Sequence, residues 1–194
     1  NVNPNLFNFN LPIGNYYMDH PYQGVAEGLV ISKKLFNYYN KNNLSNKPIL
    51  SCSNQINLSF NHSFLKNRNI LNSGMYVIFQ KADINSSFLK KLVCVAPKYV
   101  KTFIDNSTLE DSYQISVYLI QEQEALFSNK IKLGKKLDPL KVPLPEIHWK
   151  KSKLLRDSAK TLSEEFASIL IDSEIGRLAI SEHLFDDSPY KPLT

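Results

Sequence analysis

The sequence predicts an α+β fold: a mainly antiparallel sheet of about five to seven strands, with short interspersed helices and a C-terminal amphipathic helix. Two patterns carry this prediction. Before residue 137, apolar and polar residues alternate in several short segments, and the links between these segments are short and mostly non-helical, which is typical of antiparallel strands. Near the C-terminus, apolar residues instead recur every three or four positions, which is the spacing of an amphipathic helix.

The length and composition of the chain indicate one folded domain. The chain has 194 residues, of which 43% are hydrophobic and 21% are charged, a composition that disfavours intrinsic disorder. We expect an extended N-terminal arm over residues 1–15 and a single domain over residues 16–194. No apolar run approaches the ~20 residues that a membrane helix needs, so we expect no transmembrane segment. Because the chain begins at Asn1, both a cytoplasmic and an exported location stay open.

The N-terminal arm carries four apolar residues in alternation. In an extended chain, alternate side chains point to the same side, so these four residues form one apolar face. Such a face indicates either an edge strand that packs on its own domain or a segment that docks on a partner chain by strand addition. The four residues are Phe7, Phe9, Leu11 and Ile13.

The expected strands follow the alternating segments of the chain. The segment Tyr113–Gln123 is the best candidate for the centre of the sheet, because apolar residues occur on both of its faces. A strand over residues 125–133, ended by Gly134, is expected to pair with it or with a neighbour. The remaining expected elements are strands at Leu29–Ile31, Ile56–Phe60, Met75–Gln80 and Leu89–Ala96, and short helices at Ser32–Tyr39 and at Lys98–Ile104 after Pro97.

Prolines separate these strands from the C-terminal part of the chain. Pro139, Pro143 and Pro145 fall within seven residues and predict a stiff linker without regular structure over residues 138–145. The following segment, residues 146–185, is expected to be helical. Its clearest element is an amphipathic helix whose apolar stripe consists of Leu155, Ala159, Leu162, Phe166 and Ile169.

A second C-terminal helix is expected after this one. Asp172 and Ser173 are suitable N-caps for it, and Ile175, Leu178 and Ala179 would supply its apolar residues. Gly176 disfavours this helix by about 1 kcal/mol relative to alanine.

The sequence lacks the common motifs of enzymes and metal sites. It contains no G-x-G-x-x-G, G-x-x-x-x-G-K-[ST], H-E-x-x-H, C-x-x-C or G-x-S-x-G pattern. We therefore expect neither catalysis, nor a cofactor, nor a metal ion. Glu122 and Glu124 are expected to share one face of a strand end, where solvation is the simplest interpretation. The two cysteines, Cys52 and Cys94, allow one disulfide or two buried thiols, and we favour the thiols.

The densest positive charge lies between Lys130 and Arg156, where nine Lys and Arg residues accompany only Asp138 and Glu146. Lysines around the single tryptophan could bind a polyanion or a nucleic acid, an anionic membrane surface or an acidic protein. An ordinary solvated face is the alternative. The candidate polyanion-binding residues are Lys132, Lys135, Lys136, Trp149, Lys150, Lys151, Lys153 and Arg156.

Together these patterns predict a non-enzymatic protein–protein interaction module, a structural or assembly subunit of a larger complex. The first alternative is a polyanion or nucleic-acid binder that uses the basic segment 130–156. The second alternative is a small-ligand binding protein or enzyme with a pocket near residues 16–22, where His20 lies among several tyrosines.

Overall fold

The computed structural model describes residues 12–31, 55–81 and 112–186, together with Val93, Pro97 and Lys101. Several predicted features lie outside these residues: the apolar arm residues Phe7, Phe9 and Leu11, the helix expected at residues 32–39, and both cysteines, Cys52 and Cys94. Ile13, the last of the arm residues, is described. It lies in a turn and is 68% exposed.

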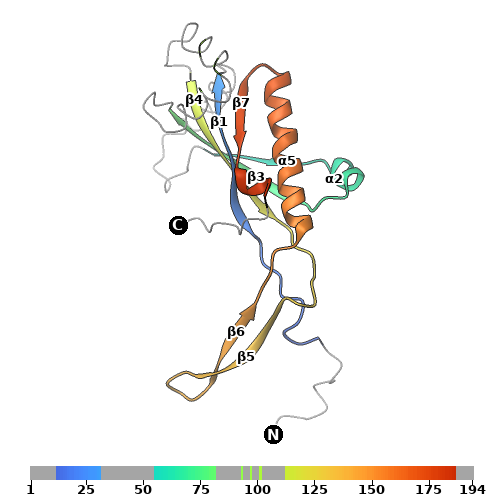
Figure 1. The fold of residues 1–194 in the computed structure, drawn as a ribbon, viewed down its shortest axis with the longest axis vertical. Helices are drawn as coiled ribbons and strands as arrows, with labels where there is room; N and C mark the ends of the chain where they lie inside the picture. The colour runs from blue at the N-terminus through green and yellow to red at the C-terminus, as the bar shows by residue number, and fades with distance from the viewer. Residues whose placement is uncertain are drawn as a thin grey trace, which may run out of the picture.

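The main layer of the structure is a five-stranded sheet with the strand order β2-β3-β4-β1-β7 (Figure 1). All of its neighbouring strands are antiparallel, so the predicted α+β fold with a mainly antiparallel sheet is confirmed. The strands are β1 (Tyr22–Ile31), β2 (Gln55–Ser59), β3 (Ser73–Lys81), β4 (Ser112–Gln121) and β7 (Gly176–Ile180).

The central position of β4 agrees with the prediction from its sequence. Ile115, Val117 and Leu119 alternate along β4 and are fully buried on the core face of the sheet. Tyr118 and Ile120 lie on the opposite face and are half-buried. Apolar residues on both faces of β4 therefore reflect its place between β3 and β1.

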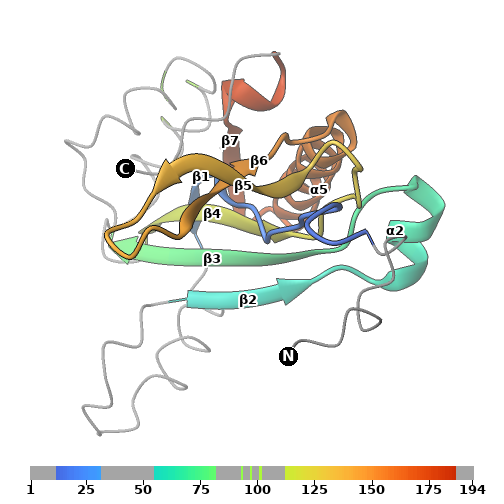
Figure 2. The same ribbon diagram turned by 90° about the horizontal axis from the view of Figure 1, so that it is seen from below.

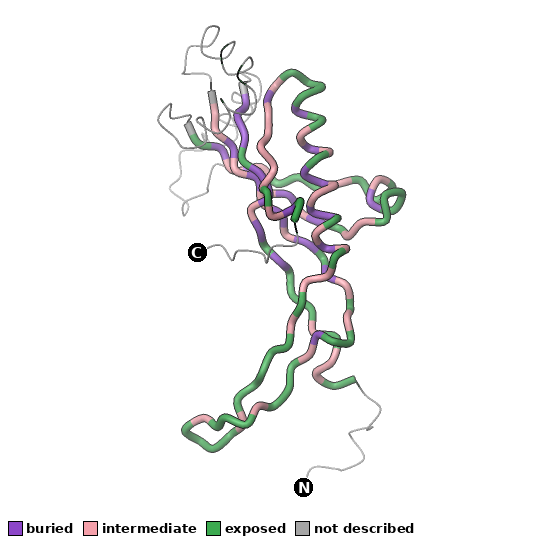
Figure 3. The backbone as a smooth tube through the Cα atoms, in the orientation of Figure 1, coloured by how far each residue is buried: buried purple, intermediate pink, exposed green. Residues whose placement is uncertain are grey.

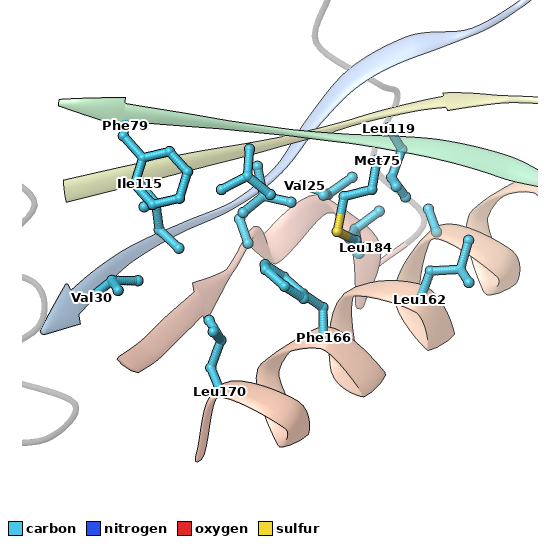
Figure 4. Packing of buried hydrophobic residues seen from close by; sticks show 14 of the residues in the cluster. Val25, Val30, Met75, Phe79, Ile115, Leu119, Leu162, Phe166, Leu170 and Leu184 are labelled. Atoms are coloured by element: carbon cyan, nitrogen blue, oxygen red, sulfur yellow. The ribbon is translucent and has the colours of Figure 1, made fainter. Parts of the chain in front are cut away.

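The helix α5 (Lys153–Asp172) covers one face of this sheet (Figures 1 and 2). It begins after Ser152, whose hydroxyl oxygen accepts a hydrogen bond from the Leu155 amide at 3.1 Å. Phe166 points from α5 toward the strands (Figure 4). The predicted amphipathic helix is confirmed, with one change in its stripe. Leu170 is buried and Ile169 is exposed, because the stripe continues four residues after Phe166 and not three.

A short helix, α2 (His62–Arg68), was not predicted from the sequence. It begins at Asn61, whose side-chain oxygen accepts a hydrogen bond from the Ser63 amide at 2.8 Å, and it ends at Asn69 in the left-handed conformation. Only Leu65 in this helix is buried. Seven residues with so little apolar periodicity give a weak helical pattern, so the caps were its only clear signal.

The second C-terminal helix was predicted wrongly, because residues 176–180 form the edge strand β7. After α5 ends, Glu174 takes a positive φ of 55°, and the chain turns back to pair with β1. A Cβ atom on Gly176 would lie 2.7 Å from the Leu29 carbonyl oxygen. The glycine that disfavoured a helix thus permits close strand pairing. A single 3-10 turn, η3 (Glu182–Leu184), follows.

The predicted strand at Leu89–Ala96 is wrong at the one described position within it, since Val93 is helical. A short apolar run cannot be assigned to a strand or a helix by its pattern alone. Pro97 and Lys101 are also helical, in agreement with the helix predicted after Pro97.

The strands β5 (Lys130–Leu137) and β6 (Pro143–His148) form a separate two-stranded sheet that projects from the main sheet (Figure 1). This corrects two predictions. The strand expected to end at Gly134 continues to Leu137 and pairs with β6 instead of β4 or a neighbour. The expected linker, residues 138–145, instead forms the turn of the hairpin and the first half of β6.

The turn of this hairpin is held by one carboxylate. Asp138 Oδ1 accepts hydrogen bonds from the amides of Leu140 and Val142, both at 2.8 Å. This Asx-type turn reverses the chain at Pro139 and Leu140, so the proline lies in a tight turn rather than a linker.

None of the helices in the described part of the chain is long and apolar enough to cross a membrane.

Candidate docking surface on the β5–β6 hairpin

The pairing of β5 with β6 separates apolar and polar side chains onto opposite faces of the hairpin. Residues directly opposite each other in an antiparallel pair share a face. The cross-strand pairs Lys130 with His148 and Lys132 with Glu146 define a polar face. What we call the apolar face consists of the pairs that alternate with these, Ile131 with Ile147 and Leu133 with Pro145, together with Leu137 and Pro143, which pair beyond a register irregularity.

The described part of the chain covers the apolar face only in part. Leu133 is 75% exposed, Ile147 59% and Leu137 56%, and none of the three belongs to the hydrophobic core under α5. At the turn, Leu140 is 82% exposed. Exposed residues run along most of the hairpin (Figure 3). Single exposed apolar residues are common, but a set gathered on one face of a projecting element is typical of an interaction surface.

The outer edge of β6 is poorly suited to pairing with another strand. The Ile131 amide points away from β6, because it donates a hydrogen bond to the Gly14 carbonyl oxygen at 2.7 Å. In an antiparallel ladder its partner Ile147 then also points away from β5. Pro145 and Pro143, two and four residues earlier on β6, have the same orientation but no amide hydrogen. This edge therefore lacks two of the donors that an added strand would need.

Gln123 fixes the hairpin to the rest of the structure. Its side-chain oxygen accepts hydrogen bonds from the Trp149 indole nitrogen at 2.8 Å and from the Asp19 amide at 3.1 Å. Its side-chain nitrogen donates to the Lys150 carbonyl oxygen at 3.3 Å. One buried amide thus joins the end of β6 to the segment before β1.

Asn129, which is fully buried, supports the other side of the hairpin base. Its side-chain amide exchanges two hydrogen bonds with the Lys150 backbone, at 2.9 and 3.0 Å. The backbone carbonyl oxygen of Asn129 accepts a hydrogen bond from the Tyr17 amide at 2.9 Å. Sequence reasoning missed both Gln123 and Asn129. A signal existed for the second, since Asn129 is the only asparagine after residue 106.

The predicted polyanion-binding residues divide into two groups. Lys132, Lys135 and Lys136 are exposed on the hairpin. The others lie at the hairpin base or at the start of α5: Trp149, Lys150, Lys151, Lys153 and Arg156.

Within the second group, several side chains already have partners inside the chain. The Arg156 guanidinium donates to the Asp186 carbonyl oxygen. The Lys151 ammonium lies 5.6 Å from the centre of the Trp149 ring, and burial lowers the pKa of Lys151. Trp149 is half-buried, and its indole N–H is bonded to Gln123. The Trp149 side chain thus takes part in packing at the hairpin base.

The two acidic residues of the hairpin are engaged within it. Asp138 holds the turn through its two amide hydrogen bonds. Glu146 lies 4.0 Å from the His148 ring nitrogen, and its side chain passes over Gly134, where a Cβ would come within 2.6 Å of it. The hairpin also carries five lysines, so its net charge is positive.

The segment predicted to form a ligand pocket borders an open depression of about 440 Å³ lined by Met18, Asp19, His20, Glu122 and Gln123. Asp19 accepts a hydrogen bond from the His20 amide at 2.7 Å. Among the described residues, no three His, Cys, Asp or Glu side chains are placed so that they could hold a metal ion.

The tyrosines of this segment do not gather around the depression. Tyr22 stacks on Tyr118 with 5.3 Å between the ring centres, on the sheet face opposite α5. Burial, Tyr118 and Tyr76 raise the pKa of Tyr22. Tyr16 instead packs against Phe127. Two of the three tyrosines that suggested a pocket, Tyr16 and Tyr22, thus belong to two separate packing contacts.

The expected strand-end pair of carboxylates was also wrong. Glu122 and Glu124 follow the end of β4 and lie in irregular structure, so no strand aligns them on one face. Glu122 accepts a hydrogen bond from the Asn72 side chain at 3.3 Å.

Neither a model of a known protein family nor a curated protein matches the sequence.

Proposed function

We propose that this protein is a non-enzymatic interaction module, a subunit of a larger complex, and that the β5–β6 hairpin is its docking element. The observation that carries the proposal is the apolar face of the hairpin, whose side chains contribute nothing to the core of the described structure. Exposed apolar side chains lower the solubility of a protein. A group of them that lies outside the core therefore fits a surface that a partner covers.

The size of the apolar face sets a limit on what it can contribute to binding. Complete burial of a leucine or isoleucine side chain gains about 1.5–3 kcal/mol. The side chains of Ile131, Leu133, Leu137 and Ile147 are already partly covered, so their further burial gains roughly 5 kcal/mol together. That gain is near the lower estimate, about 4 kcal/mol, of the cost of association. Apolar contact alone therefore gives weak binding, and a stable complex needs further contacts.

The test compares two matched double variants of the tagged chain in extracts of its native source. Leu133→Ser with Ile147→Ser removes the apolar face, whereas Ile169→Ser with Ile171→Ser removes two other exposed apolar side chains, on α5 and at its end. Sedimentation velocity should show the wild type and the α5 variant in a large assembly and the hairpin variant at the mass of the free chain. A wild type that sediments as a free chain would refute the proposal.

Polyanion binding is the alternative that the exposed lysines of the hairpin favour. It predicts retention on immobilised heparin that weakens steeply with added salt and is lost when Lys132, Lys135 and Lys136 are changed to glutamine. The engaged position of Trp149 argues against base stacking as a part of this binding. If heparin binds the wild type and the triple variant equally at low salt, this alternative fails.

A further inference from the structure

We propose that the hairpin enters a cleft of a partner protein that has one apolar wall and one acidic wall, and that it docks by its faces without adding a strand. The inference rests on the proposed function and names the chemistry of the partner. It follows from the two faces of the hairpin, the charge of its lysines and the blocked edge of β6.

The two faces require two different surfaces. Ile131, Leu133 and Ile147 lie on one face, whereas Lys130 and Lys132 lie on the other. The hairpin is a single two-stranded layer, so both faces are available to the same partner. A flat protein surface can cover only one of them. A cleft can cover both, and negative charge on its wall toward Lys130 and Lys132 would complement these two lysines.

The lysines of the hairpin favour an acidic partner over a second copy of this chain. Among the described residues, no ion pair is formed by Lys130, Lys132, Lys135, Lys136 or Lys141. Two hairpins packed by their apolar faces would leave Lys130 and Lys132 on the outside, so a second copy would supply no carboxylate to them. Carboxylates of an acidic partner instead supply the further contacts that the apolar face alone lacks.

The edges of the hairpin favour docking by faces. Pro143 and Pro145 remove two donors from the outer edge of β6. On the other side, the start of β5 is already paired, because Asn15 forms a bridge with Lys130 and Gly14 accepts from the Ile131 amide. Strand addition to β6 would therefore form an interrupted ladder. On β5 only the part beyond Ile131 is open, and it contains the register irregularity of the hairpin, which disfavours an added strand.

A lipid surface fits the hairpin less well than a protein cleft. If the apolar face lay on an anionic bilayer, Lys130 and Lys132 would point away from the lipid phosphates. If the hairpin entered by its turn, Lys135, Lys136 and Lys141 would enter the hydrocarbon with Leu140. Each charge placed there is costly, at least about 2.5 kcal/mol at the bilayer centre.

The test uses a photoreactive amino acid at two neighbouring positions of the full chain in its native extract. One variant carries it at Leu133, on the apolar face, and the other at Lys132, on the polar face; a third carries it at Ile169 on α5 as the control. The two hairpin positions should form adducts with the same foreign polypeptide, and the peptide linked to position 132 should contain several Asp or Glu residues. Position 169 should form no such adduct.

Other adducts would overturn the inference. A lipid adduct would assign the hairpin to a membrane surface, an adduct with a second copy of this chain would contradict the charge argument, and an adduct from only one face would contradict a cleft. These results differ from failure of the proposed function, in which the wild type sediments as a free chain and neither hairpin position forms any foreign adduct.

Salt and charge supply an independent check on the acidic wall. Lys130→Gln with Lys132→Gln should weaken the assembly by about tenfold or more, since close charge pairs at interfaces contribute at least this much. Lys130→Arg with Lys132→Arg keeps the charge and should retain the assembly. Raising NaCl from about 50 to about 500 mM should dissociate the wild type. An assembly that resists salt and tolerates the glutamine variant would contradict the acidic wall.

Discussion

At the scale of single residues, Gln123 connects three segments that are distant in the sequence. Its amide is the hydrogen-bond partner of Trp149, Asp19 and Lys150. In Gln123→Ala these groups lose their partners near the hairpin base, where an unsatisfied buried group costs about 1–3 kcal/mol. We expect urea unfolding to show a loss of about 2 kcal/mol and the Trp149 fluorescence to shift to longer wavelength.

The neighbouring substitution Glu124→Ala is the control for Gln123→Ala. Glu124 is only half-buried, and its side chain makes no hydrogen bond with a described residue. It should leave both the stability and the fluorescence unchanged. Equal effects of the two substitutions would mean that the Gln123 amide does not hold the hairpin base.

Gly176 determines how closely β7 can approach β1. A Cβ at this position would meet the Leu29 carbonyl oxygen at 2.7 Å and the Val30 side chain at 3.1 Å. Gly176→Ala should therefore lower the free energy of unfolding by about 1–3 kcal/mol, the usual cost of overpacking. Gly74→Ala is a suitable comparison, because its Cβ would meet only the Tyr76 ring, at 3.7 Å. If both variants unfold at the same urea concentration, close approach of β7 is not what Gly176 provides.

The protonation of His183 makes the stability of the folded state depend on pH. Burial, Arg156 and Lys151 lower its pKa below the usual 6.5, whereas Asp186 acts in the opposite direction. The folded state therefore binds a proton less readily than the unfolded state. Its contribution to stability is complete above about pH 6.5 and is lost as the pH falls through the lower, folded-state pKa.

A histidine substitution isolates this contribution from the other groups that titrate. Between about pH 7.5 and about pH 5, the wild type should lose more thermal stability than His183→Gln. The quantity to compare is the change in melting temperature of each protein across this range. Parallel losses in the two proteins would assign the pH dependence to other residues.

At the scale of elements, the hairpin and the five-stranded sheet are separable. The hairpin contributes no residue to the core cluster. The cross-strand pair at its base, Lys130 opposite His148, is close enough to be joined by a two-residue turn. Replacing residues 131–147 with Asn-Gly should leave the melting temperature within a few degrees of the wild type, as measured by circular dichroism. A variant that fails to fold would show that the hairpin is part of the fold and not an appended docking element.

The outcome for each element shows which physical signals a sequence carries. The helix α5 and the central strand β4 were predicted because burial on one or two faces imposes a clear period on the residues. The strand β7 was missed because its five residues depend on the free edge of β1, a tertiary partner that no local pattern reveals. Gly176 disfavoured the predicted helix, but only the Leu29 contact explains its presence.

The hairpin was missed for a different reason. Its three prolines indicated a linker, because prolines interrupt ladders in the interior of a sheet. Pro143 and Pro145 lie on an outer edge, where no ladder bond is lost, and Pro139 lies in the turn. The basic residues of the hairpin were recognised in the sequence, but their separation from the apolar face depends on strand register. Register follows from the pairing partner, and that partner was predicted wrongly.

At the scale of the whole molecule, the described structure consists of a sheet covered by α5 and a hairpin that leaves this body (Figure 1). The body buries a core between β1, β3, β4 and α5. The hairpin instead exposes apolar side chains on a base fixed by Gln123 and Asn129. The account of this protein as a docking subunit depends on this division of roles.

Hydrogen–deuterium exchange of the chain, free and within its native assembly, tests that division most directly. The account predicts that assembly slows exchange over residues 130–148, while exchange in β3, β4 and α5 stays as it is in the free chain. Unchanged exchange in the hairpin, with new protection on α5 or on the sheet face that carries Tyr22, would contradict it and would place the docking surface on the body of the protein.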